Sequence, residues 1–219
     1  MSDFSLWDIY RNLLWALCWT VGLSAIAFTG GSLVGGTLLV LRLLQRRKLT
    51  RLIALYVQLF QGTPLLMQLF LTYFGLGLLG IDTSPMFAAC LCLTLYASAY
   101  LTEIWRGCVA AVPRQQWEAG ASLALSFGEQ LRYVILPQAS RLAVAPTVGF
   151  LVQAIKATAL ASVIGFVELT RSGQIIANAT FAPFLVYGSV ALFYFLLCFP
   201  LSLLSRHLEH KFTLGSRKP

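Results

Sequence analysis

Apolar and polar segments alternate along the whole chain. The apolar runs cover about residues 13–44, 65–80, 86–112, 142–167 and 184–204. A helix needs about 20 predominantly apolar residues to cross a bilayer core of roughly 30 Å, and only the run at 65–80 is clearly shorter. The pattern predicts an all-α membrane protein with five transmembrane helices.

The second run is preceded by a break. Residues 52–60 are apolar, but Gln61, Gly62, Thr63 and Pro64 follow before the apolar pattern resumes. Proline lacks the backbone donor and disfavours helical angles in the residue before it. We predict a helix break near the inner membrane surface and then a short span. Gln61 and Thr63 are expected to satisfy backbone groups that the break frees.

Composition supports the membrane assignment. The 219 residues are 58% hydrophobic and only 11% charged, with a mean hydropathy of +0.77. A soluble domain has about 25% charged residues. The length suits one transmembrane domain over residues 1–219. The five cysteines lie in or beside apolar runs without a metal-type spacing, so we expect packing residues and no metal site.

The basic residues indicate the orientation. The chain has 16 Lys and Arg against 8 Asp and Glu, a net charge of +8. With Lys156 inside a run, Arg11 and Arg171 fall on one side of the five predicted spans. The other side receives Arg42, Arg46, Arg47, Lys48, Arg51, Arg106, Arg114, Arg132, Arg141, Arg206, Lys211, Arg217 and Lys218. Cytoplasmic loops are enriched in Lys and Arg, so we predict an outside N-terminus and a cytoplasmic C-terminus.

A polar insert separates the third and fourth runs. Residues 117–123 favour a short helix, and Ser126 with Glu129 fits a capping box at the start of a second. Pro137 is predicted to end that second helix. A cytoplasmic insert over 113–141 is typical of a docking element, although an amphipathic helix resting on the lipid has the same pattern.

The residues of this insert also resemble a known signature. Glu118, Ala119 and Gly120, then Ala124, then Leu136 and Pro137 after an isoleucine, are similar to the EAA motif of ATP-binding cassette (ABC) importer permeases. Further pieces are similar to the polar amino acid branch of that family: QGTPLLMQLFLTYFGL at 61–76, SAYLTEIWRG at 98–107, VILPQA at 134–139, ASVIGFVELTR at 161–171 and FPLSLLSRHLE at 199–209.

The resemblance implies the type I importer permease fold in a bacterial inner membrane. It implies a second permease copy or paralogue, two cytosolic ATPase subunits and an extracytoplasmic amino acid-binding protein. The EAA loop then supplies the coupling helix that docks on an ATPase, with Glu118, Ala119, Gly120, Ala124, Ser126, Leu136 and Pro137 as the coupling residues. The chain has no GxxxxGK[ST] motif, so ATP and Mg²⁺ are expected on the partner subunit and no cofactor on this chain.

Two positions of the insert differ from the family pattern. Gly120 stands where alanine is usual, and Ala124 where glycine is usual. Alanine in a left-handed turn costs about 1 kcal/mol or more relative to glycine. Either the turn is built differently or its strain is tolerated. We expect the small residue at 120 to let the loop seat closely on its partner.

Polar residues within the spans are candidate pathway residues. Glu103 and Arg106 are three residues apart on one helix and can pair. Lys156 is expected to face a cavity, a cluster of carbonyl groups or a substrate carboxylate, with Gln153 and Thr158 as weaker candidates. Ala157 follows this lysine where the family often has an acid, which favours neutral or acidic amino acids over cationic ones.

Other functions remain open at this point. The same machine could carry another small solute. A self-sufficient secondary carrier or channel needs no ATPase but leaves the insert unexplained. A membrane enzyme is the third class, and the sequence contains no HExxH or GxSxG motif and no paired carboxylates in a span. The permease subunit of a polar amino acid importer is therefore the predicted function, without enzymatic activity of its own.

Overall fold

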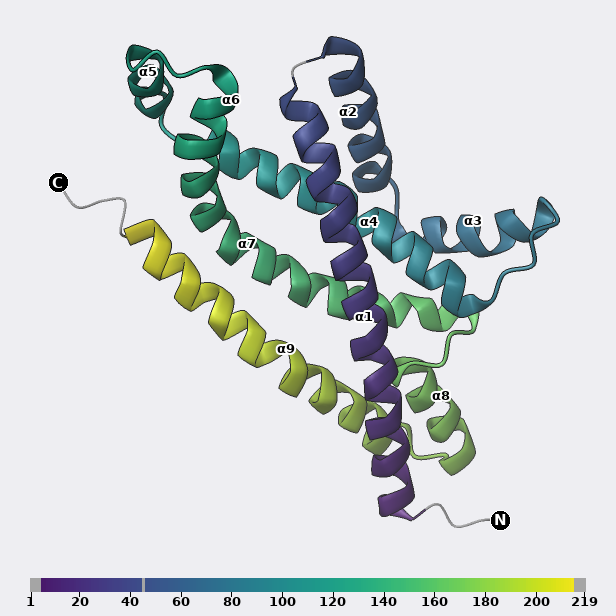
Figure 1. Cartoon of the computed structure of the whole chain (residues 1–219). Helices are drawn as coiled ribbons and strands as arrows, with labels where there is room; N and C mark the ends of the chain where they lie inside the picture. Colours follow the sequence, from purple (N-terminus) through teal and green to yellow (C-terminus); the bar gives the residue numbers. More distant parts are fainter. Residues whose placement is uncertain (1–4, 45, 215–219) are drawn as a thin grey trace.

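The computed structural model describes residues 5–44 and 46–214, and each regular element in these ranges is helical (Figure 1). The elements, in chain order, are α1 (Leu6–Leu43), α2 (Arg47–Gly62), α3 (Leu65–Leu78), α4 (Pro85–Ala110), α5 (Arg114–Ser122), α6 (Phe127–Glu129), the π-helix η1 (Gln130–Ile135), α7 (Leu136–Ala157), the 3₁₀ helix η2 (Thr158–Ile164), α8 (Leu169–Thr180) and α9 (Pro183–Leu214).

Within the described ranges, four helical stretches are long and apolar enough to cross a membrane alone: Leu6–Leu43, Pro85–Ala110, Phe127–Ile164 and Pro183–Phe212. A fifth span exists only if α2 and α3 are counted together, because their axes differ by 103° at the break. The predicted break at Pro64 is confirmed. The sequence did not indicate how sharply α3 turns away from α2 at this break.

The break is satisfied by a residue that the sequence pattern did not single out. The side-chain amide of Gln68 donates to the carbonyls of Phe60 and Thr63, at 2.8 and 3.0 Å. The Thr63 hydroxyl donates to the Leu59 carbonyl at 2.7 Å. Carbonyl groups freed by a helix break need such partners where no water is available. Thr63 therefore has the predicted structural role, while the Gln61 side chain makes no hydrogen bond to the described residues.

Close backbone packing joins α1 to α4. A Cβ atom built on Gly31 would lie 2.5 Å from Cβ of Ala97, and one on Gly35 would lie 2.9 Å from the Ser98 carbonyl oxygen. The Thr102 hydroxyl donates to the Gly35 carbonyl across the same interface, at 3.2 Å. Gly31 and Gly35 are four residues apart, which is a GxxxG spacing. Small residues at this spacing let the backbones of two membrane helices approach each other.

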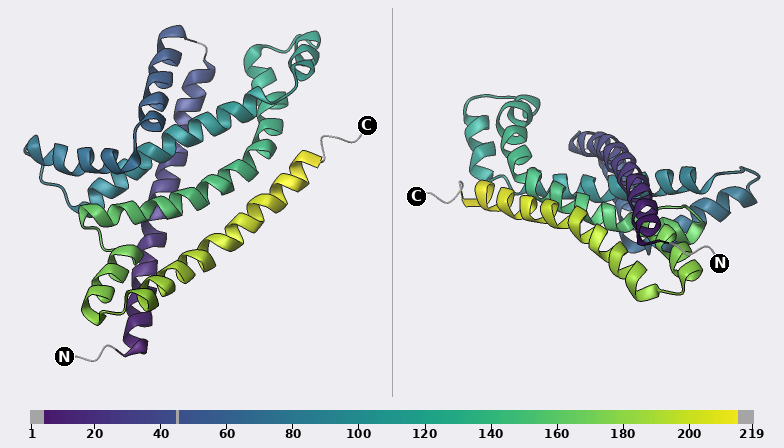
Figure 2. Two further views of the ribbon diagram at one scale, coloured as in Figure 1. Left: turned by 180° about the vertical axis from the view of Figure 1, so that it is seen from behind. Right: turned by 90° about the horizontal axis from the view of Figure 1, so that it is seen from below.

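The long helices form a layer with α1 on one side. Helices α4, α7 and α9 run side by side, and α1 crosses them (Figures 1 and 2). The N-terminal end of α1 and α8 lie toward one end of the molecule. The connection between α1 and α2, together with α5 and α6, lies toward the other (Figure 1). The predicted basic side of the chain coincides with this second end, although Arg217 and Lys218 lie outside the described residues.

The chain leaves the insert without a break. Pro137 was predicted to end the second helix of the insert and a separate span to begin near residue 142. Instead Leu136 has helical angles (φ −60°, ψ −39°), and the helix runs from the insert into α7. The π-helix at Gln130–Ile135 explains the difference. Pro137 has no backbone N–H to donate. The wider π-turn before it shifts the register of the backbone hydrogen bonds, so the helix continues through the proline.

Candidate functional site

The insert packs on the C-terminal ends of α1 and α4 and on the N-terminal part of α7. A buried cluster of Val109, Val112, Ile135 and Ala139 forms its base, and Trp117 and Leu43 contact this cluster. The Trp117 and Phe127 rings stack with centroids 5.8 Å apart, which links α5 to α6. The loop is therefore a folded unit fixed to α4 and α7, and it projects beyond the layer of long helices (Figure 1).

The capping box predicted for α6 is present. The Ser126 backbone N–H donates to Oε2 of Glu129 at 2.8 Å, and the Glu129 N–H donates to the Ser126 hydroxyl at 3.4 Å. The hydrogen bonds from Ser126 hold the pKa of the Glu129 carboxyl below its ordinary value. Because the folded-state pKa is lowered, the contribution of this box to stability is complete at neutral pH and is lost only as acid protonates Glu129.

The turn between α5 and α6 has the hydrogen bonds of a Schellman motif. The Leu125 N–H donates to the Gly120 carbonyl at 3.2 Å, and the Ala124 N–H donates to the Ala121 carbonyl at 2.9 Å. Ala124 has φ 58°, the left-handed conformation that this motif normally gives to glycine. Of the two alternatives left by the sequence, the turn thus keeps its geometry and tolerates the strain of alanine.

Gly120 has a different structural reason from the one predicted. It is buried inside the loop, and a Cβ atom at this position would lie 3.0 Å from Cγ of Gln130. The Gln130 side chain in turn donates to the Leu125 carbonyl at 2.7 Å. Its small size therefore allows α5 to pack on η1, which is an internal reason for glycine in addition to the predicted close seating of the loop on a partner.

One face of the insert is exposed and partly apolar. Leu123 is 75% exposed, and Phe127 and Tyr133 are also exposed. Glu118 is exposed beside Arg114, with Oε1 of the glutamate 3.3 Å from Nε of the arginine. Apolar and aromatic side chains beside polar ones are typical of a protein-docking surface. Leu136 and Pro137 are also exposed, where η1 passes into α7.

A second group of candidates lies near the outer end of α7. Gln153 and Lys156 are both exposed on this chain and lie three residues apart, on one face of the helix. The Gln153 amide donates to the Tyr96 hydroxyl at 2.9 Å. Thr158 is buried, and its hydroxyl donates to the Ile155 carbonyl at 2.7 Å. The structure thus places Gln153 and Lys156 together on the surface and turns Thr158 inward.

Ala157 and Glu103 lie apart from this pair. Ala157 is half-buried against the apolar cluster that includes Leu23 and Ala161. Glu103 lies in the C-terminal half of α4, where it pairs with Arg106 as predicted and also with Arg42 of α1, at 3.0 Å between Arg42 Nη1 and Glu103 Oε2. Two guanidinium groups on one carboxylate indicate a link between α1 and α4.

Sequence reasoning missed a buried carboxyl group at the outer end. Glu168 is fully buried at the N-cap of α8, and its Oε1 accepts the Arg171 N–H at 2.9 Å. Its Oε2 accepts the Tyr194 hydroxyl at 2.8 Å, and Thr20 of α1 lies 3.4 Å from the same oxygen. A glutamate one residue before an apolar helix was the only local signal. The partners on α1 and α9 are distant in sequence.

Three comparisons with known proteins agree with each other. The family described as "Binding-protein-dependent transport system inner membrane component" matches residues 27–214. The L-cystine transport system permease protein TcyB of Bacillus subtilis (strain 168) is 32% identical, over 94% of this chain and 90% of that protein. The glutamine transport system permease protein GlnP of Escherichia coli (strain K12) is also 32% identical, over 94% and 95%. The crystal structure of an amino acid ABC transporter with histidines superposes with a TM-score of 0.90 at 31% identity, over 96% of this chain and 99% of that one.

Proposed function

The chain belongs to the binding-protein-dependent transport system inner membrane component family, and from this premise we propose that it is the membrane-spanning permease subunit of an ATP-driven importer of polar amino acids. The observation that carries the proposal is the folded insert with its exposed face, in a chain whose full length resembles amino acid permeases. A self-sufficient carrier would have no use for that insert. ATP hydrolysis belongs to a separate subunit of such a system.

The exposed face of the insert is the surface on which the ATPase docks. Leu123, Phe127 and the Glu118 carboxylate supply the apolar and charged contacts. Two ATPase subunits, each holding ATP and Mg²⁺, serve the two permeases of the complex. Closure of the ATPases on ATP can shift the permease only through a difference in affinity between its conformations. The docked loop provides that difference because its position changes with the state of the spans.

The insert is continuous with α7, so a movement of the insert is transmitted directly to that helix. Residues of α6 and η1 run into α7 without an intervening coil, and α7 carries Gln153 and Lys156 near its other end. A displacement of the loop is therefore passed along one continuous helical path to the face that bears the polar side chains. The buried cluster around Ile135 joins the same movement to α4.

Gln153 and Lys156 contribute to the solute pathway of the complex. A cationic side chain exposed on a membrane span needs a water-filled cavity or a polar partner. A second permease, identical or paralogous, covers this face and encloses the pathway. The binding protein delivers the amino acid on the outer side, near α8.

Co-purification and reconstitution test this function. The tagged chain expressed in its own host should bring down an ATPase in a roughly equimolar amount. Proteoliposomes of this complex should take up labelled glutamine or cystine only with ATP at the ATPase and with the binding protein present. Uptake by the purified chain alone, driven by a proton or sodium gradient, would contradict the assignment.

The orientation is tested by thiol labelling. In a variant without the five native cysteines, a cysteine introduced at the exposed Gln115 should resist an impermeant thiol reagent in intact cells and react after lysis. The matched control is Asn178→Cys on the exposed side of α8, which should react in intact cells. Labelling of residue 115 from outside would reverse the topology derived from the basic residues.

A further inference from the structure

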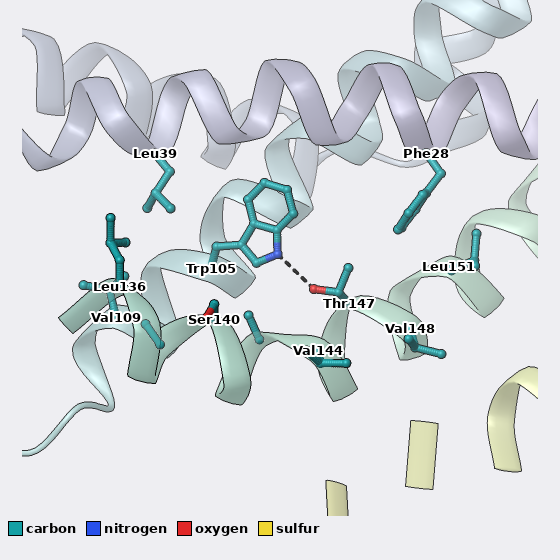
Figure 3. A pocket seen from close by; sticks show the side chains of 12 residues that line it. Phe28, Leu39, Trp105, Val109, Leu136, Ser140, Val144, Thr147, Val148 and Leu151 are labelled. Atoms are coloured by element: carbon teal, nitrogen blue, oxygen red, sulfur yellow. Dashed lines mark hydrogen bonds between the residues drawn. The ribbon is translucent and has the colours of Figure 1, made fainter. Parts of the chain in front are cut away.

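An apolar cavity of about 560 Å³ lies between α1 and the layer of α4 and α7. Phe28 and Leu39 of α1 line it on one side, Trp105 and Val109 come from α4, and Val144 and Leu151 are among the residues of α7 (Figure 3). The side chains of the three helices point into one shared space, and the cavity is open to the outside of the chain.

The few polar groups in the wall are already satisfied. The indole N–H of Trp105 donates to the Thr147 hydroxyl at 2.9 Å, which is the bond drawn in Figure 3. The Ser140 hydroxyl donates to the Pro137 carbonyl at 3.0 Å. Among the residues that the structure describes, no charged side chain lines the wall. The cavity therefore suits an apolar chain and lacks the groups that would bind the charged ends of an amino acid.

The cavity faces away from the polar residues of α7. With 3.6 residues per turn, Lys156 and Gln153 lie about 160° and 220° around the helix from Ser140. Gln153 also contacts Tyr96 on the far side of α4 from this cavity wall. The face of α7 that bears Gln153 and Lys156 is thus opposite to the cavity. A second permease that packs against that face therefore leaves the cavity open to lipid.

Each of the three helices carries an arginine within one turn of a cavity residue. Arg42 follows Leu39 by three residues, Arg106 lies between Trp105 and Val109, and Arg141 follows Ser140. Within these stretches of α1, α4 and α7 the only acid is Glu103, so three arginines against one glutamate leave a net charge of +2. Glu103 uses only part of the five N–H donors that each guanidinium has.

We propose that this cavity holds one acyl chain of an anionic phospholipid of the inner leaflet, with the lipid phosphate bound at the rim by the arginines. The bilayer itself is as apolar as the cavity, so the chain alone gains little by leaving it. Charge complementarity at the rim supplies the preference, because positive side chains at the inner surface attract anionic headgroups. The acyl chain of the lipid then fills the cavity between α1 and the layer of α4 and α7.

Native mass spectrometry of the permease–ATPase complex tests the proposal. The probes are phosphatidylglycerol and phosphatidylcholine with the same acyl chains, added in defined amounts to the detergent. We expect one phosphatidylglycerol retained per chain, about 25-fold more strongly than phosphatidylcholine, since each of the two net positive charges contributes a factor of about five. Equal retention of the two lipids, or retention of neither, would overturn the site.

Variants separate the acyl site from general lipid contact. Val144→Trp fills the cavity and should abolish retention, whereas Leu192→Trp adds the same ring at an exposed position of α9 and should leave it unchanged. Arg141→Gln should reduce the preference for phosphatidylglycerol several-fold. Retention in Val144→Trp equal to the wild type would place the lipid elsewhere.

Photolabelling covers the case in which Val144→Trp does not assemble. Phosphatidylglycerol with a photoreactive group on its acyl chain should label wild-type peptides that contain Trp105 or Thr147. Exclusive labelling of α9 would contradict the proposal. In the cysteine-free background, oxidative cross-linking of Val144→Cys to the same residue of a second copy would also overturn it, because a protein would then occupy the cavity.

Discussion

Gly120→Asp and Glu118→Lys should each abolish ATP-driven uptake while the chain still inserts in the membrane. At Gly120 the reason is internal. The space for a Cβ atom is limited by Cγ of Gln130 at 3.0 Å, and a buried aspartate has no cationic partner there. The substitution displaces Gln130, which holds the turn through the Leu125 carbonyl. Uptake and ATPase association should fall together.

Glu118→Lys acts from the outside of the loop. Its ion pair with Arg114 is exposed, and an exposed pair contributes only about 0–1 kcal/mol to folding. The loop should therefore stay folded with a lysine at 118. A reversed charge on the docking face can nevertheless cost several kcal/mol against a complementary partner surface. The measurements are labelled uptake, and co-purification of the ATPase, in both variants.

Ala124→Gly is the matched control in the same turn. Glycine relieves the positive φ of 58°, so the turn should be retained or gain about 1 kcal/mol. Uptake should equal or exceed the wild-type value. Wild-type uptake in Gly120→Asp and Glu118→Lys would exclude this loop as the coupling element. Loss of uptake in Ala124→Gly would show that the turn tolerates no change, and the two other variants would then carry no specific information.

Local rules predicted the elements whose causes are local. Hydrophobic length gives α1, α4, α7 and α9, because a bilayer sets the required number of apolar residues. The capping box at Ser126 follows in the same way from a short motif.

Geometry that depends on distant residues was not predictable. Pro64 signals a break but not its angle of 103°, which depends on how α3 packs against α4. Pro137 was expected to end a helix, since the rule for the preceding residue does not foresee a π-turn. At Glu103, the neighbour Arg106 was visible in the sequence, whereas Arg42 becomes a partner only through the crossing of α1 and α4.

In the candidate site, too, the features with local causes were predictable, and those that depend on the folded geometry were not. The composition and order of the insert predict a docking loop, yet the roles of Gly120 and Ala124 depend on which backbone angles the turn adopts. Thr158 appeared equivalent to Gln153 by position, but the change from α7 to the 3₁₀ helix η2 turns it inward. A periodicity of 3.6 residues cannot describe a helix that tightens at its end.

Lys156→Gln should weaken amino acid binding to the membrane complex about ten- to a hundredfold. Hydrogen bonds to charged groups contribute about 1.5–3 kcal/mol, which corresponds to that range. Lys156 is exposed on the polar face of α7, where it can meet a substrate carboxylate. Direct binding of labelled glutamine to the solubilised permease–ATPase complex, without the binding protein, measures this contact apart from the selectivity of the receptor. Arg171→Gln, which removes a positive charge from α8, should leave the affinity unchanged.

The same measurement ranks substrates by charge. The described residues of α7 and η2 include no acid, and Ala157 follows Lys156 at the position where the sequence resemblance implies an acid. An unpaired cation within a membrane domain is costly, so glutamine and glutamate should compete better than arginine.

Ala157→Asp should raise the affinity for arginine. Because residue 157 is half-buried against Leu23 and Ala161, the new carboxylate needs a cationic side chain to offset its desolvation, which a bound arginine supplies and glutamine does not. Arginine as the best competitor of the wild type would contradict the role of Ala157, and an unchanged ranking in Ala157→Asp would move the selectivity to the binding protein or to the second permease.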